Sequence, residues 1–229
     1  MTRGLYIILF FAAVLIVESC KNNDEVFPNI KPCFFNVVNA SPDTLNFYLN
    51  GTRQNDNSSL FPGSASGYTS INSGSENIQF KKNGGFNDLF SVPLVLTDSL
   101  NYSLFVTGTS ASGAFNSVDI LDTTGLGSSY LYFKVRFVNA SPNAGNLDVS
   151  VGDSISFSAK AFKTISLFVA GGAGIKEVKI FPSGSTTNPL VDTSITFQAD
   201  NLYTIFSKGQ LNGKGSSAFN VGVTLNPFY

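Results

Sequence analysis

The chain has 229 residues and a formal net charge of −1 at pH 7, and 43% of its residues are hydrophobic. This apolar content is enough for buried cores, so intrinsic disorder of the whole chain is excluded. No basic run or Arg-rich stripe occurs in the sequence, and we therefore expect no nucleic-acid partner.

Residues 1–19 are typical of a secretory signal peptide. Arg3 precedes an apolar run at 5–17, which is shorter than the roughly 20 residues of a membrane-spanning helix. The Val-Glu-Ser-Cys sequence that ends at Cys20 resembles a bacterial lipobox, although Glu18 replaces the usual small or apolar residue. We expect lipidation of Cys20 to anchor the protein to the outer membrane, on the periplasmic or the cell-surface face.

Residues 20–31 are interpreted as the lipidated cysteine and a polar linker. The linker begins with Lys-Asn-Asn-Asp-Glu, which resembles the export tether of Bacteroidetes lipoproteins. With Cys20 lipidated, the only other cysteine, Cys33, has no partner for a disulfide within the chain. Cys33 is followed by two phenylalanines, so we expect it to be a small buried hydrophobe at the start of a strand.

The most informative feature of the remaining chain is a repeat. The sequence Val-Asn-Ala-Ser-Pro at 38–42 returns at 138–142. After a two-residue insertion, 45–51 aligns with 147–153, and both segments have the alternating apolar pattern of strands. The correspondence continues to the end of the chain, so we interpret the mature protein as one unit present twice.

The repeat predicts a first domain at 32–124 and a second domain at 130–229, joined by a Gly/Ser-rich connector at 125–129. Turn residues recur about every eight to twelve positions, and the segments between them alternate apolar and polar residues. The predicted fold class is therefore all-β, with two tandem immunoglobulin-like β-sandwich domains after a lipoprotein signal peptide.

Two repeated residue types predict corners of these sandwiches. Asn39 and Asn139 can form Asx turns before the prolines of the repeated motif, and we favour this structural role over a ligand site. Tyr102 and Tyr203 stand near the start of the penultimate strands and resemble tyrosine corners, in which the phenol hydrogen-bonds to the backbone.

The segment Lys-Val-Arg-Phe-Val-Asn-Ala-Ser-Pro at 134–142 resembles the opening of the domain-of-unknown-function 4397 family. This resemblance implies a secreted or lipid-anchored bacterial protein, often with tandem copies, an immunoglobulin-like fold and no established activity. The first copy departs from the pattern at 34–36, where Phe-Phe-Asn replaces the basic residues. The family provides no functional residues that could be transferred to this chain.

The sequence argues against an enzyme. It contains no histidine, the usual general base and the commonest transition-metal ligand. Asp119 and Asp122 are a close carboxylate pair on a predicted strand, but their spacing of three places them on opposite faces. Gly171–Gly174 is followed by no helix and suggests a hairpin instead of a phosphate cradle. We therefore expect no catalytic residues, no metal site and no cofactor.

A binding surface is the remaining candidate site. Tyr130, Tyr132, Lys134 and Arg136 alternate with apolar residues, so they form an exposed aromatic and basic stripe if those apolar residues face the core. Such a stripe could bind a protein or glycan ligand. The simpler alternative, which we favour, is that these side chains pack against the first domain or are solvated.

The predicted function is that of a non-enzymatic, lipid-anchored cell-envelope protein whose tandem domains serve adhesion, assembly or ligand binding. The alternative is a carbohydrate-binding accessory lipoprotein of a glycan-uptake system. The chain contains no tryptophan, the largest aromatic platform for a sugar, but Tyr130 and Tyr132 could take its place.

Overall fold

Strands make up most of the described chain, which comprises residues 31–109, 114–122 and 131–226 of a computed structural model, with only the backbone described at 114–122. The predicted signal peptide, Cys20, the connector and Tyr130 lie outside these ranges. The described residues contain one helical element, the 3-10 turn Gly215–Ser217, and no helix long and apolar enough to cross a membrane.

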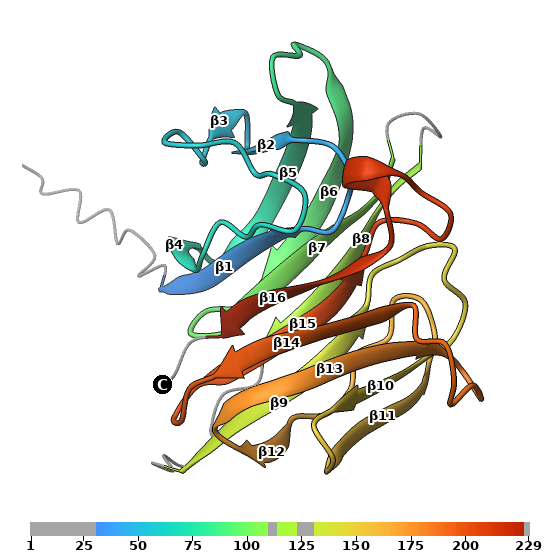
Figure 1. The fold of residues 1–229 in the computed structure, drawn as a ribbon. Coiled ribbons are helices and arrows are strands. Elements are labelled where there is room, and N and C mark those ends of the chain that lie inside the picture. Colours follow the sequence, from blue (N-terminus) through green and yellow to red (C-terminus); the bar gives the residue numbers. More distant parts are fainter. Residues whose placement is uncertain (1–30, 110–113, 123–130, 227–229) are drawn as a thin grey trace, which may run out of the picture. The chain divides into compact units, whose positions relative to one another are not determined.

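The first domain consists of two four-stranded sheets, in the orders β4-β1-β7-β8 and β3-β2-β5-β6 (Figure 1). Its strands are β1 (Pro32–Asn39), β2 (Leu45–Leu49), β3 (Thr52–Arg53), β4 (Thr69–Asn72), β5 (Gly74–Lys82), β6 (Asp88–Leu96), β7 (Asn101–Thr109) and β8 (Ala114–Asp122).

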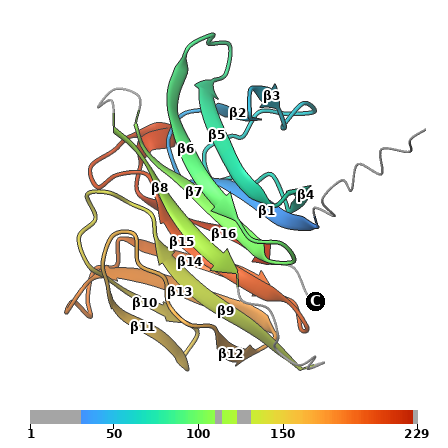
Figure 2. The same ribbon diagram turned by 180° about the vertical axis from the view of Figure 1, so that it is seen from behind.

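The second domain repeats this arrangement strand for strand, with sheets β12-β9-β15-β16 and β11-β10-β13-β14 (Figure 2). Its strands are β9 (Tyr132–Asn139), β10 (Leu147–Val151), β11 (Ile155–Lys160), β12 (Val169–Gly172), β13 (Gly174–Pro182), β14 (Val191–Phe197), β15 (Leu202–Lys208) and β16 (Asn220–Asn226). The prediction of an all-β chain with two tandem sandwich domains is confirmed.

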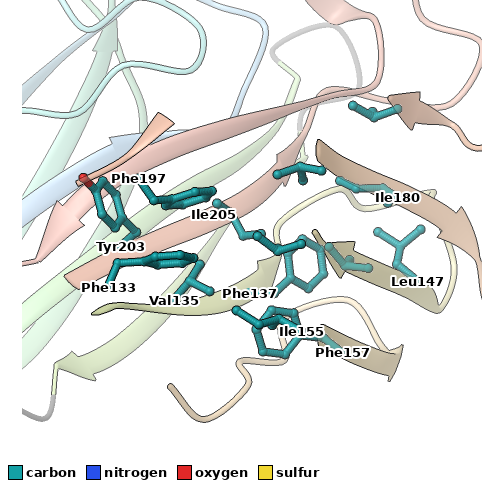
Figure 3. Close-up of a cluster of buried hydrophobic side chains, with 14 of the residues drawn as sticks. Phe133, Val135, Phe137, Leu147, Ile155, Phe157, Ile180, Phe197, Tyr203 and Ile205 are labelled. Carbon is teal, nitrogen blue, oxygen red and sulfur yellow. The ribbon is translucent and has the colours of Figure 1, made fainter. Parts of the chain in front are cut away.

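Each sandwich has its own core, built from the residues that face inward at alternate positions along its strands. In β9, Phe133, Val135 and Phe137 are all buried in the core of the second domain, as their parity predicts. In β1, Cys33, Phe35 and Val37 occupy the matching places in the first core. The central cluster of the second domain is shown in Figure 3.

The first strand of each domain pairs in parallel with the seventh. Phe35 is opposite Tyr102 in the first domain, and Val135 is opposite Tyr203 in the second. In constant-type immunoglobulin domains the first strand instead pairs with the second, in the order ABED. The sandwich architecture is therefore immunoglobulin-like, whereas the order of its strands is different.

Asn139 closes the corner at which the chain leaves the first sheet of the second domain. Its Nδ2 donates to the carbonyls of Gly145 and Lys160, both at 2.9 Å. Its Oδ1 accepts from the Ser141 N–H at 3.2 Å and from the Ser207 hydroxyl at 2.9 Å. The side chain is fully buried, so one amide joins three separate segments to the end of β9.

Asn39 has the same role in the first domain. Its Nδ2 donates to the Asp43 carbonyl at 2.7 Å and to the Leu60 carbonyl at 2.9 Å. Its Oδ1 accepts from the Ser41 N–H at 3.0 Å and from the Ser41 hydroxyl at 2.7 Å. The bond from the amide two residues ahead is the Asx turn predicted for both copies, and that prediction is confirmed.

The predicted tyrosine corners are also present. The Tyr102 hydroxyl accepts from the Thr97 N–H at 2.9 Å, and the Tyr203 hydroxyl accepts from the Gln198 N–H at 3.0 Å. Each phenol thus satisfies a backbone donor in the turn before its own strand while its ring packs against the core.

A third apolar cluster contains equivalent residues of both domains. The rings of Phe105 and Phe206 meet edge to face, with centroids 5.4 Å apart. The Asn226 Nδ2 donates to the Tyr68 hydroxyl at 2.9 Å, and the Gly209 N–H donates to the Ala40 carbonyl at 3.2 Å. The six buried members of the cluster are Val38, Ala40, Phe105, Val138, Ala140 and Phe206.

Cys33 is a buried free thiol in the first core, as its sequence context predicts. Burial raises the pKa of the thiol, and the nearby Glu76 carboxylate adds to this rise. Both effects lower the fraction of nucleophilic thiolate.

We expect Asn139→Ala to lower the free energy of unfolding by about 2 to 4 kcal/mol, because buried partners of the amide lose their bonds. Urea denaturation of the purified protein measures this change. Asn87→Ala is the matched control, since Asn87 is exposed, and we expect it to stay within about 0.5 kcal/mol of wild type. Equal effects of the two variants would contradict the role assigned to Asn139.

We expect Cys33 to react with a water-soluble maleimide only after the protein is unfolded, because the folded thiol is buried and protonated. Mass spectrometry of the Cys33 peptide, with and without urea, gives the extent of labelling. Complete labelling of the folded protein within minutes would show that this end of β1 opens readily.

Candidate functional site

The stripe predicted on β9 is exposed at one end only. Tyr132 is 51% exposed and Lys134 is partly buried, whereas Arg136 is only 2% exposed. The expectation that Arg136 lies on an exposed surface is therefore wrong. The outer face of β9 is not free at this position, because Val138 and the neighbouring Phe206 belong to the cluster shared by both domains.

Arg136 has structural contacts. Its Nε donates to the Thr204 hydroxyl at 2.8 Å, and its guanidinium carbon lies 4.7 Å from the centre of the Phe168 ring. The Thr204 hydroxyl in turn donates to the Asn226 Oδ1 at 2.6 Å. Arg136 thus belongs to a buried hydrogen-bonded chain, and packing explains its position without a ligand.

The carboxylate pair singled out in the sequence lies on β8. Asp119 is opposite Leu104 and Asp122 is opposite Asn101 on β7. The prediction that their carboxylates lie on opposite faces concerns side chains outside the described part of the structure. Across the described ranges, no group of three or more His, Cys, Asp or Glu side chains is placed to hold a metal ion.

The two domains differ most at the edge formed by β3 in one and β11 in the other. In the second domain, β11 pairs with β10 along its length, with Ile155 opposite Val151 and Phe157 opposite Val149. Phe157 is buried beside Ile155 and Phe137 (Figure 3), and the two phenylalanine rings lie 6.5 Å apart. This edge of the second sandwich is therefore filled.

In the first domain the same edge opens after β3. The Gln54 N–H still donates to the Phe47 carbonyl at 3.0 Å, which places Gln54 at the position of Phe157. The chain then leaves the edge over residues 55–59 and returns at Leu60, which exchanges two backbone hydrogen bonds with Leu45.

A pocket of about 230 Å³ lies between this loop and the open edge. Most of its lining consists of amide, hydroxyl and carboxylate side chains, and three residues supply apolar surface. The lining residues are Phe47, Gln54, Asn55, Asp56, Asn57, Ser58, Leu60, Ala65, Ser66 and Thr69.

Asn55 holds the loop that forms the polar wall. Its Oδ1 accepts from the Phe47 N–H at 3.0 Å, replacing a backbone partner at the edge of β2. Its Nδ2 donates to the Asn46 Oδ1 at 3.1 Å and to the Ser58 carbonyl at 2.9 Å. These bonds fix the loop. The neighbouring side chains of Asp56 and Asn57 are exposed and can contact other molecules.

Asp148 performs the corresponding task in the second domain, where the bulge is shorter. Its carboxylate accepts from the Ala159 N–H at 2.6 Å, the Gly184 N–H at 2.8 Å and the Ser183 hydroxyl at 3.0 Å. The two backbone hydrogen bonds, with help from Ser183, lower the pKa of Asp148. This carboxylate is therefore fully engaged in hydrogen bonds within its own domain.

A difference between the two copies in the sequence indicates this pocket. The second copy has Ile-Ser-Phe at 155–157, with apolar residues in alternation, whereas the first copy has Thr-Arg-Gln at the equivalent positions 52–54, followed by Asn-Asp-Asn-Ser-Ser at 55–59. Loss of the apolar alternation in one copy alone indicates an edge strand that no longer packs into the core.

The fold and the pocket define a tandem β-sandwich protein with a polar pocket in its first domain. A family model described as "Domain of unknown function (DUF4397)" matches residues 34–129 and 133–222. The chain belongs to this family, with two tandem copies, as the sequence motif predicted.

One solved structure similar to this chain is that of a protein from Bacteroides eggerthii, provisionally named as a cell adhesion protein. The two share 9% sequence identity over 87% of this chain and 96% of the other, with a TM-score of 0.21. A similarity of this size supports no conclusion about function. No curated protein matches the sequence.

We expect Gln54→Phe to raise the free energy of unfolding by about 1 kcal/mol, because it places the residue type of the second domain at the equivalent edge and fills the pocket. Urea denaturation measures the change. Gln198→Phe, at an exposed position, is the control and should give no gain. A destabilised Gln54→Phe protein would contradict the assignment of Gln54 to the position of Phe157.

Proposed function

We propose that the chain is a lipid-anchored protein of the cell envelope that binds a ligand and does not transform it. The tandem sandwiches serve as a stable support, and the pocket beside β3 is the binding site. Adhesion or assembly at the envelope would use the same support, with the pocket or an exposed edge as the contact.

The composition of the pocket is the observation that carries this proposal. Its lining contains one carboxylate, Asp56, and no second acid or base. Hydrolysis of glycosides needs a pair of carboxyl groups about 5 to 9.5 Å apart, and the chain contains no histidine to serve as an alternative base. The pocket offers hydrogen bonds in several directions, which supports recognition over chemistry.

The anchor is supported by the sequence that ends at Cys20. Lipid chains on this cysteine would partition into a membrane at about 0.8 kcal/mol per buried methylene. The polar residues of the linker up to residue 31 would separate the first sandwich from the membrane surface. The outer membrane, on its periplasmic or cell-surface face, is the proposed location.

A carbohydrate-binding accessory role in a glycan-uptake system is the second candidate. The amide and hydroxyl side chains of the pocket favour it, because these groups both donate and accept hydrogen bonds, as sugar hydroxyls do. Tyr132 and Lys134 at the end of β9 are a second proposed contact surface, of which Tyr132 is the more exposed member.

We expect Cys20→Ala to abolish metabolic labelling with a palmitate analogue and to release the protein from the membrane fraction. Cys33→Ala is the matched control, because it removes the other cysteine and should leave labelling unchanged. Labelling that persists in Cys20→Ala would overturn the anchor, and so would labelling that disappears only in Cys33→Ala.

A further inference from the structure

We propose that the pocket beside β3 binds a single neutral sugar residue of a glycan. This inference rests on the proposed binding function and gives it a site and a ligand class. It places the contact on the first domain, away from the aromatic stripe that the sequence suggests on the second.

The size of the pocket suits one sugar ring. Its volume of about 230 Å³ equals the space that about eight water molecules occupy in the liquid. Pockets for drug-sized molecules begin at about 300 Å³. One pyranose unit fits this space, and the rest of a glycan would extend past the exposed loop at 56–58.

The polar wall matches the hydrogen-bonding pattern of a polyol. Asn57 supplies an amide with two donors and an acceptor, Asp56 supplies acceptor oxygens, and Ser58 supplies a hydroxyl. Sugar hydroxyls each donate and accept, so adjacent hydroxyls can bond to adjacent amide and carboxylate groups. The Asn55 amide is occupied by the backbone and keeps this wall in place.

The apolar residues of the lining suit the C–H groups of a sugar ring. Phe47, Leu60 and Ala65 contribute its apolar surface. Phe47 and Leu60 are nearly fully buried, so this surface is held by the core and need not be ordered when a ligand binds. Small-molecule pockets combine apolar surface with polar groups, and this pocket has both, with polar residues in the majority.

The charge of the lining selects against anions. No lysine or arginine lines the pocket, and Asp56 is its one charged residue. A phosphate, sulfate or uronic acid would meet a carboxylate with no cation to offset the repulsion. A neutral sugar avoids this repulsion.

The second domain can be compared with the first at this position, because the equivalent space is filled there. There Phe157 occupies the edge and is only 4% exposed, so only the first domain presents the space. The two copies therefore have the same fold, and the first has polar residues in place of Ile155 and Phe157 where the pocket lies.

The test uses the full chain, purified in a detergent without a sugar headgroup, and saturation-transfer NMR. The probes are the methyl glycosides of glucose, galactose, mannose and N-acetylglucosamine, with methyl glucuronide and inorganic phosphate as charged comparators. We expect at least one neutral glycoside to bind with a Kd of about 1 mM, the range for so small a ligand.

Three variants locate the site. Gln54→Phe should weaken binding at least tenfold, because the phenylalanine fills the pocket. Gln198→Phe, the same change at a residue of the second domain that is exposed like Gln54 but does not line the pocket, should bind as wild type does. Tyr132→Ala tests the second proposed contact surface, on β9, because Tyr132 is not part of the pocket.

Unchanged affinity in Gln54→Phe would overturn the pocket as the site. Loss of binding in Tyr132→Ala alone would move the sugar site to β9, which would overturn this inference and leave the proposed binding function standing. Binding of the charged comparators alone would overturn the neutral ligand class. Binding of no probe would overturn the sugar assignment, while labelling at Cys20 reports separately on the anchored function.

Discussion

A fully buried asparagine side chain at the end of the first strand is the interaction on which each sandwich depends. Asn39 and Asn139 each use Nδ2 to join the end of this strand to the corner that follows it and to a segment 21 residues further along the chain, while Oδ1 accepts the Asx-turn bond. A buried amide with every partner satisfied is stabilising, but one that loses a partner costs a large part of the stability of a domain. This explains why the motif is present twice: the same corner has to be closed twice. The chain can then cross to the second sheet, and the parallel pairing of β1 with β7 and of β9 with β15 can form.

Duplication also decides which surfaces are available for binding. The sheets that contain β1 and β9 are buried on both faces at Val38 and Val138, because equivalent residues of the two domains meet in one apolar cluster. Such contacts between matching residues resemble the self-complementary interface of a symmetric dimer. A ligand cannot use the part of this face that the cluster covers. Binding is therefore directed to the free edges and outer sheets, and the two copies are free to differ there. The edge at β3 and β11 is where they differ most, since Gln54 stands in one copy where Phe157 stands in the other.

Features that depend on neighbours in the chain could be predicted from the sequence. The Asx turns at Asn39 and Asn139 and the tyrosine corners at Tyr102 and Tyr203 are local geometries with local signatures.

The exposure of Arg136 could not be predicted, because alternation along a strand separates two faces without showing which face is exposed to solvent. Its hydrogen bond to Thr204 joins residues that are far apart in the sequence. The pocket was missed for a related reason: the loop at 55–59 becomes a wall only because Leu60 returns to pair with Leu45.

The sequence by itself determined the doubled unit, the all-β class, the family, and the corners that close each sandwich, because repeated motifs, alternation and turn chemistry are properties of neighbouring residues. Only the tertiary structure decided that the polar face of β9 is buried at Arg136, and that the first copy keeps an open edge beside β3. These outcomes depend on contacts between residues far apart in the chain. One domain covers a face of the other, and Phe157 fills a space in the second domain that Gln54 leaves open in the first.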